Sequence, residues 1–330
     1  MSRFANRAHR AVLFGGVAAL IAFAASAQAA NFPDRPVTLA VAFPPGGPSD
    51  VLARIVGKKM QELLGEPFVV ENKPGAGGNI AAEFVARAKP DGYTLLMGNN
   101  SILATNEFLY KKLSFNPQKD FMPITLIGTQ ANILVVNRKL PVQSLQDLID
   151  LCHAQPGKIN FASSGFGAAA HLAGELFKAE AHVDIVHVPY KGAAPALQDV
   201  IAGNDQMMFA TAASVIGHIK NGQVRALAVT TLNRTAILPD VPTMDEAGLK
   251  GFEASTWHGL VAPAGTPPDI MAKLHEAAVT ALHDPGVQAS LQRLGVDIVA
   301  DTPQEFASYI AKERPKWAAV VKASGATVDK

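Results

Sequence analysis

Short apolar runs alternate with amphipathic segments along most of the chain, starting at Val37. The first run predicts a strand over residues 37–43, and a helical periodicity then continues to about Leu64. Ser49 or Asp50 is expected to cap the start of this helix, because either side chain can accept a backbone hydrogen bond there. Strands alternating with helices predict a parallel sheet covered by helices. The next elements are predicted as strands at 67–72 and 93–98 and a helix at 79–88.

A second set of alternating elements follows in the middle of the chain. It predicts another α/β unit, similar in layout to the first but without close sequence similarity. Its strands are predicted at 159–163, 184–189, 206–210 and 225–231, and its helices at 168–179, 193–202 and 214–220.

Two longer apolar runs, 123–136 and 254–262, lie between or beyond these units. We interpret them as paired crossover strands that join two lobes. The remaining C-terminal part is predicted to be helical and to return to the first lobe. Asp284, followed by a proline, is typical of a helix start, and Thr302-x-x-Glu305 predicts a capping box at the start of the last helix.

These elements predict an α/β fold class in which two Rossmann-like domains are joined by two crossover strands and enclose a cleft. The first domain is predicted to contain residues 30–128 and 253–330, and the second residues 129–252. A chain of this length is expected to form two domains rather than one. Pro315 is expected to kink the last helix.

The first 29 residues predict a secretory signal peptide. Three arginines form a basic start, and the apolar segment 11–25 is shorter than the roughly 20 residues that a membrane span needs. An A-x-A cleavage motif ends at Ala29. A retained membrane anchor is the weaker alternative. The pattern therefore predicts an exported, soluble protein, and a bacterial periplasm fits best.

Composition narrows the function classes further. Loss of the three leader arginines would lower the formal net charge from +1 to −2, so the chain lacks the basic surface that nucleic acid or an anionic membrane requires. The single cysteine, Cys152, cannot form an internal disulfide and lies in a predicted helix, where it is interpreted as a small core residue.

Two Gly-rich turns carry the candidate chemistry. Residues 37–60 and 159–177 both contain an apolar strand, a Gly-rich turn with hydroxyl residues and an amphipathic helix. Such a turn directs free backbone N–H groups and the positive end of a helix dipole at one point. The pair predicts one anion held between two α/β halves, without a requirement for lysine or arginine.

Other chemistries are disfavoured. Neither turn contains the lysine of a P-loop, and the G-x-G-x-x-A match at 165–170 lacks the acidic residue that a dinucleotide site needs after the next strand. His171 and Glu175 have metal-ligand spacing but no third ligand, so we interpret His171 as a packing residue. No G-x-S-x-G nucleophile motif follows a strand. We therefore expect no cofactor, no metal and no catalytic residues.

Six sequence blocks carry a resemblance to a known family. They lie at 43–50, 69–98, 163–177, 187–203, 238–248 and 259–267, and they include FPPGGPSD, SSGFGAAAHLAGELF and HVPYKGAAPALQDVIAG. These blocks resemble, in order, the Bug family of tripartite tricarboxylate transporter substrate-binding proteins. The resemblance implies a type II-like periplasmic binding protein fold with a hinged cleft. It also implies a monomer that captures a small organic carboxylate and delivers it to membrane permease subunits.

The resemblance also implies a set of ligand-binding residues. In the first lobe they are Pro45, Gly46, Gly47, Ser49, Asn79 and Asn99. In the second lobe they are Ser163, Ser164, Gly165, Gly167, Ala168, Tyr190, Lys191, Ala210 and Thr211. The chain departs from the family pattern at three of these places. Asn99-Asn100 stands where Gly-Thr-Ser-like sequences are common. Alanines follow Gly167 where many relatives have Thr or Ser, and Ala210-Thr211 stands where relatives often have Asp-Asn. A carboxylate able to hold an ammonium group is therefore missing, which favours a plain carboxylate ligand.

Two functions from different classes remain. The leading hypothesis is a non-catalytic solute receptor that serves a permease. The alternative is an exported enzyme that acts on a small carboxylate with a similar two-lobed scaffold. The absence of a recognisable nucleophile–base pair or metal-ligand set favours the receptor.

Overall fold

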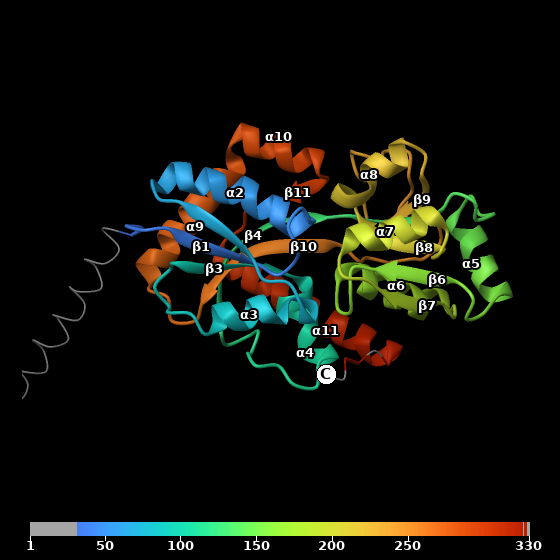
Figure 1. Ribbon diagram of the computed structural model, residues 1–330, viewed down its shortest axis with the longest axis horizontal. Helices are drawn as coiled ribbons and strands as arrows, with labels where there is room; N and C mark the ends of the chain where they lie inside the picture. The colour runs from blue at the N-terminus through green and yellow to red at the C-terminus, as the bar shows by residue number, and fades with distance from the viewer. Residues whose placement is uncertain (1–31, 326, 329–330) are drawn as a thin grey trace, which may run out of the picture.

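The computed structural model describes residues 32–325 and 327–328, and it folds them into two α/β lobes that lie side by side (Figure 1). The first lobe contains the early strands and the C-terminal helices, and the second is built from the middle of the chain. The predicted two-lobed α/β fold is confirmed. The domain limits at 128 and 252 stay a prediction, and the predicted signal peptide, residues 1–29, lies outside the described residues.

A six-stranded mixed sheet forms the centre of the first lobe. Its strands are β1 (Val37–Val41), β2 (Phe68–Asn72), β3 (Thr94–Asn99), β4 (Phe121–Gln130), β10 (Thr256–Pro263) and β11 (Val296–Ile298). They are arranged in the order β11-β4-β10-β3-β1-β2. β1 pairs in parallel with β2 and β3, whereas β10 runs antiparallel to both β3 and β4.

A five-stranded mixed sheet forms the centre of the second lobe. Its strands are β5 (Asn132–Asn137), β6 (Asn160–Ser163), β7 (Val186–Pro189), β8 (Met207–Thr211) and β9 (Val224–Val229). They are arranged in the order β7-β6-β8-β5-β9. β6 is parallel to its neighbours β7 and β8, and β5 is antiparallel to β8 and β9.

Helices cover both faces of each sheet (Figure 1). In the first lobe they are α2 (Pro48–Leu64), η1 (Ala76–Gly78), α3 (Asn79–Ala86), the π-helix η2 (Ser101–Thr105), α4 (Asn106–Leu109), α9 (Pro268–His283), α10 (Pro285–Arg293) and α11 (Pro303–Ser324). In the second lobe they are α5 (Leu145–Ala154), α6 (Ala169–Ala181), α7 (Ala193–Ala202) and α8 (Ala212–Lys220). In the part of the chain that the structure describes, no helix is both long enough and apolar enough to span a membrane.

Successive side chains of a strand point to opposite faces of the sheet, and this alternation explains how each sheet is packed against the helices on both sides. Val37, Leu39 and Val41 of β1 pack against α2 and α9 on one face of the first sheet, whereas Ala40 joins the core on the other face. That second core continues through α11 into the second lobe, where Phe161 belongs to it. The two lobes therefore share buried apolar surface on the α6–α11 side of the molecule.

Two local predictions need correction. The N-cap of α2 is Gly47 and not Ser49 or Asp50, because Pro48 begins the helix and its fixed φ suits the first helical position. Asp50 instead reaches back to the Gly46 N–H group from the first turn. The apolar run 123–136 also divides at Ala131 into β4 and β5, which belong to different sheets.

Several other predicted features are confirmed. β4 and β10 form an antiparallel pair along their whole length, as expected of paired crossover strands. Asp284 caps α10, and Thr302 with Glu305 forms the capping box of α11. Cys152 is buried in α5. α11 runs from Pro303 to Ser324 with Pro315 inside it, and the expected kink stays a prediction.

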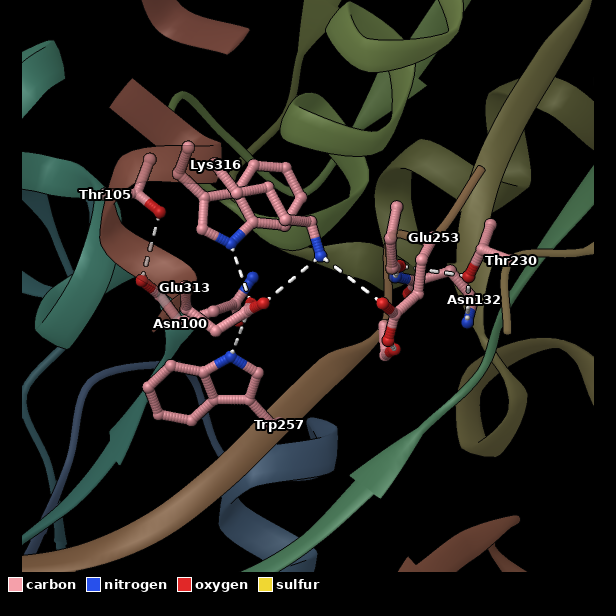
Figure 2. A network of polar contacts seen from close by, with 11 residues as sticks. Asn100, Thr105, Asn132, Thr230, Glu253, Trp257, Glu313 and Lys316 are labelled. Carbon is pink, nitrogen blue, oxygen red and sulfur yellow. Dashed lines mark hydrogen bonds and ion pairs between the residues drawn. The ribbon is translucent and has the colours of Figure 1, made fainter. Parts of the chain in front are cut away.

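A buried carboxylate ties α11 to the crossover strand β10. Glu313 Oε2 accepts the indole N–H of Trp257 in β10 at 3.1 Å and that of Trp317 in α11 at 2.9 Å, as Figure 2 shows. Its other oxygen accepts Lys316 Nζ at 3.1 Å. Lys316 also lies 3.8 Å from Glu253, in the segment that leads out of the second lobe. One carboxylate therefore connects both tryptophans of the chain at the crossing point.

The amide of Asn132 joins the two crossing segments to each other (Figure 2). Its Nδ2 donates to the carbonyl of Ala254 at 2.7 Å, and its Oδ1 accepts from Thr256 Oγ1 at 3.0 Å. Thr230 Oγ1 also donates to the Ala254 carbonyl. These bonds hold the start of β5 against the segment that enters β10.

Candidate functional site

A cleft of about 450 Å³ lies between the two lobes and collects most of the predicted site residues. Its walls come from the turn before α2 in the first lobe and from the starts of three helices in the second lobe. The predicted residues that line it are Pro45, Gly46, Gly47, Ser49, Asn99, Ser164, Ala168, Lys191, Ala210 and Thr211.

Four helices begin at this cleft. The lining residues include the first turns of α2, α6, α7 and α8, such as Ser49, Ala169, Ala193 and Ser214. The first N–H groups of a helix have no acceptor inside the helix, and the helix dipole places positive charge at that end. Five of these first-turn residues are alanines (Ala169, Ala170, Ala193, Ala194 and Ala213), so a ligand can approach the backbone closely there. The arrangement suits a negatively charged ligand.

Two of these helix starts, those of α7 and α8, were not predicted as anion-binding helix termini, although the family resemblance implied their neighbours Lys191 and Thr211 as site residues. The α7 start follows Gly192, whose φ of 120° only glycine adopts readily, and two alanines come next. The α8 start follows Thr211 and is also rich in small residues. A glycine or hydroxyl residue followed by alanines at a strand-to-helix junction is the signal that could have indicated them.

The glycine turns shape the cleft, and their own N–H groups are already engaged. Gly46 N–H donates to Asp50 Oδ2 at 2.9 Å, and Gly47 N–H donates to the Pro44 carbonyl at 3.3 Å. In the second lobe, Gly167 N–H donates to His171 Nδ1 at 3.1 Å. The donors that remain for a ligand are therefore the first-turn N–H groups of the helices that follow.

A serine–histidine pair lies in the wall of the cleft. Ser49 Oγ and His258 Nε2 are 2.8 Å apart, and His258 is only 2% exposed on β10. Burial lowers the pKa of His258 to about 4, so the ring is neutral at neutral pH. It offers one N–H donor and one acceptor nitrogen to Ser49 or to a ligand. Sequence reasoning missed His258 because a lone histidine in an apolar strand is usually a packing residue.

This pair does not make a hydrolytic site. A general base works best with a pKa near the working pH, and the pKa of His258 lies well below it. Ser49 is also buried at the start of a helix rather than exposed on a nucleophile turn.

The other polar groups in the cleft favour an anion. Lys191 is the one lysine or arginine among the lining residues, and none of these residues is aspartate or glutamate. Asn99, Asn132, Thr256 and Gln198 add neutral donors and acceptors, and the His218 ring also lines the cleft. An ammonium group that entered this cleft would find no charged partner, whereas a carboxylate would find donors from both lobes.

Five predicted site residues do not line the cleft, and two of them, Asn79 and Gly167, are hydrogen-bonded to helices of the first lobe. Asn79 Oδ1 accepts from Asn106 Nδ2 at 2.6 Å, within the first lobe. Asn106 Nδ2 also donates to the Gly77 carbonyl, so the start of α3 is tied to α4. Gly167 of the second lobe accepts a hydrogen bond from Ser101 Oγ of η2 through its carbonyl. The Ser101–Gly167 bond thus joins the two lobes, whereas Asn79 braces the first lobe alone.

The other three lie within the second lobe. Ser163 Oγ lies 2.6 Å from His187 Nε2 and also accepts the Gly165 N–H at 3.1 Å. Burial and the neighbouring His171 ring, stacked at 4.1 Å, lower the pKa of His187 to about 3. The Tyr190 hydroxyl lies within hydrogen-bond distance of the carboxylates of Asp199 and Asp205. The Ser163 and Tyr190 hydroxyls and the Gly165 N–H group are thus engaged within the second lobe.

Comparison with known proteins agrees with this geometry. Residues 52–326 match the TctC family, described as the tripartite tricarboxylate transporter family receptor. Rpa4515 of R. palustris, solved with adipate, is 36% identical and superimposes with a TM-score of 0.85 over 89% of this chain and 98% of its own. The periplasmic binding protein BugD is 37% identical, with a TM-score of 0.84 over 90% and 99%.

MatC of Rhodopseudomonas palustris, solved with bound malate, is 35% identical, with a TM-score of 0.83 over 88% of this chain and 100% of its own. The family match covers most of the chain and includes three of the four helix starts at the cleft in full. The hypothesis of an exported enzyme is therefore dropped. The chain belongs to the tripartite tricarboxylate transporter receptor family, whose members are solute-binding proteins and not enzymes.

Proposed function

We propose that this chain is a periplasmic receptor that binds a small carboxylate without an ammonium group and delivers it to the membrane subunits of a tripartite transporter. The single observation that carries the proposal is the convergence of four helix N-termini on a cleft that contains Lys191 and no acidic side chain. The adipate bound by Rpa4515 and the malate bound by MatC support the ligand class.

The expected sizes of the binding free energies favour a cleft that closes over its ligand. While the cleft is open and its helix termini are solvated, each terminus stabilises an anion by about 0.3–1 kcal/mol, so four termini supply at most about 4 kcal/mol. Micromolar binding needs about 8 kcal/mol. The difference has to come from charge-assisted hydrogen bonds in a site that excludes water. We therefore propose that residues 129–252 move against the rest of the chain about the crossing segments.

The remaining parts of the proposal concern location and assembly. The predicted leader over residues 1–29 and the periplasmic relative BugD support export to the periplasm. The small cleft and the two complete lobes within one chain support a monomer as the binding unit. The family description supports membrane subunits as the partner.

Isothermal titration with matched pairs of compounds tests the ligand class. Succinate and L-aspartate differ by one ammonium group, as do adipate and 2-aminoadipate. For at least one pair we expect the plain acid to bind with micromolar affinity and its amino derivative to bind at least tenfold more weakly, about 1.4 kcal/mol. The reason is that the cleft has no carboxylate to pair with the ammonium group.

Malate, benzoate and 1,4-butanediamine complete the panel. The diamine is expected not to bind, because it presents only positive charge to helix N-termini. Equal affinity for succinate and aspartate would contradict the exclusion of an ammonium group. Tighter binding of the diamine than of every acid would overturn the proposal of an anion receptor.

A further inference from the structure

A negative charge stands where the proposed function needs positive potential. Asp50 lies in the first turn of α2, one of the four helix starts at the cleft, and is 2% exposed. Its neighbours Ser49 and Val51 line the cleft, whereas Asp50 does not. An uncompensated carboxylate at this position would repel an incoming anion through the same helix start that attracts it.

The Asp50 carboxylate has four donors, which come from three parts of the first lobe. It accepts the Gly46 N–H at 2.9 Å, and this bond fixes the glycine turn in front of the helix. Asn72 Nδ2, at the end of β2, donates to Oδ1 at 2.9 Å. Arg54 donates Nε to Oδ2 at 3.0 Å and Nη2 to Oδ1 at 2.9 Å, which is the two-point geometry of a strong guanidinium–carboxylate pair.

The carboxylate therefore remains charged while it holds the turn. Burial by itself would raise the pKa of Asp50, but the hydrogen bonds from Arg54, Gly46 and Asn72 outweigh it and lower the pKa below its usual value. Arg54 sits one helical turn further along α2, its side chain is 54% exposed, and it does not line the cleft. Its guanidinium is thus placed to neutralise Asp50 and not to touch a ligand.

We infer that Asp50 and Arg54 form a positioning pair: Asp50 holds the ligand-binding turn through Gly46, and Arg54 cancels the charge of Asp50 so that the start of α2 stays attractive to a carboxylate. This inference rests on the proposed function. It assigns Arg54, an exposed residue outside the cleft, an effect on ligand affinity that acts through Asp50.

Charge rescue in a pair of variants tests the inference. Binding is measured by isothermal titration at low ionic strength. The ligand is whichever of adipate, malate and succinate the wild-type protein binds most tightly. Arg54→Gln leaves Asp50 unpaired and is expected to weaken binding at least fivefold. The double variant Asp50→Asn with Arg54→Gln removes both charges and keeps an acceptor for the Gly46 N–H. It is expected to bind at least threefold more tightly than Arg54→Gln, because the unpaired negative charge is gone.

Arg87→Gln is the matched control. Arg87 also pairs with an acid four residues earlier on a first-lobe helix, Glu83, and its side chain is 69% exposed. The substitution changes the net charge equally, so it reports any general effect of charge. The deficit of Arg54→Gln should also shrink as salt is raised from about 0.01 to 0.15 M, because screening weakens repulsion. A purely structural role of Arg54 would not show this dependence.

The outcomes separate the inference from the function on which it rests. If the wild-type protein binds none of the acids, the proposed function fails and the inference fails with it. If wild type binds and Arg54→Gln matches Arg87→Gln, only the inference is overturned. A double variant as weak as Arg54→Gln alone also overturns it, because charge cancellation would then not be the cause.

Discussion

At the scale of single residues, the cleft depends on a neutral histidine that burial maintains. His258 has a pKa of about 4 in the folded protein, below the roughly 6.5 of an exposed imidazole. Between these two pKa values, His258 carries a proton in the unfolded chain but not in the folded protein. The unfolded state therefore binds more protons, and stability falls as the pH falls from 6.5 towards 4. Above pH 7 the His258 ring is largely neutral in both states, so it no longer makes the unfolding free energy depend on pH.

The predicted pH effect can be isolated with His258→Gln, which removes the titrating ring. Urea unfolding of the ligand-free protein at pH 7.0, 6.0 and 5.0 should show a shallower loss of unfolding free energy for the variant than for wild type. The difference in slope between pH 6 and pH 5 should approach about 1.4 kcal/mol per pH unit. Identical slopes for the two proteins would show that His258 titrates normally.

At the scale of elements, two helical glycines have opposite surroundings. A Cβ added at Gly174 in α6 would lie 2.2 Å from the Phe161 ring, whereas a Cβ at Gly217 in α8 would meet nothing within 4 Å. Phe161 is fully buried in β6, so it has little room to move. Gly174 is therefore a packing requirement, and Gly217 is a weak point of its helix.

Alanine at each position gives a matched prediction. Gly174→Ala should destabilise the protein by about 1–3 kcal/mol through overpacking against the sheet. Gly217→Ala should stabilise it by about 0.5–1 kcal/mol, because alanine has the higher helix propensity and meets no obstacle. Thermal and chemical unfolding measure both. A stable Gly174→Ala protein would mean that α6 can move away from the sheet.

At the scale of the whole molecule, Glu313 holds the C-terminal helix to the crossing point of the two lobes. Glu313→Ala leaves the indole N–H groups of Trp257 and Trp317 without their acceptor in a buried place. Each unsatisfied donor costs about 1–3 kcal/mol, so a total loss of about 2–6 kcal/mol in unfolding free energy is expected. Glu313→Gln keeps a neutral acceptor oxygen and should lose less.

Exposed Glu276 of α9 provides the control for this prediction. Glu276→Ala should leave the denaturation midpoint unchanged within error, and tryptophan fluorescence should follow the loss of structure in the Glu313 variants. A Glu313→Ala protein as stable as the control variant would mean that water replaces the carboxylate at both indoles.

Local features of this protein followed from the sequence because they depend on residues close together in the chain. Asp284 with Pro285 and Thr302 with Glu305 mark helix starts through hydrogen bonds within one turn. Alternating strands and helices predicted the parallel β1–β2 and β1–β3 pairs and the two lobes. The Gly-rich turns before α2 and α6 predicted an anion site between the lobes, and ten of the fifteen predicted site residues line the cleft found there.

Tertiary structure decided which polar groups face the cleft. A side chain has few hydrogen-bonding groups, and the residues packed around it determine which partners those groups bind. Nothing near Ser49 in the sequence indicates that its hydroxyl would hydrogen-bond to His258, 209 residues later. Asn79 and Tyr190 match the family pattern, but Asn106 and two aspartates engage their polar atoms away from the cleft. The starts of α7 and α8 become part of the site only because the second sheet brings the ends of β7 and β8 to the same edge as β6.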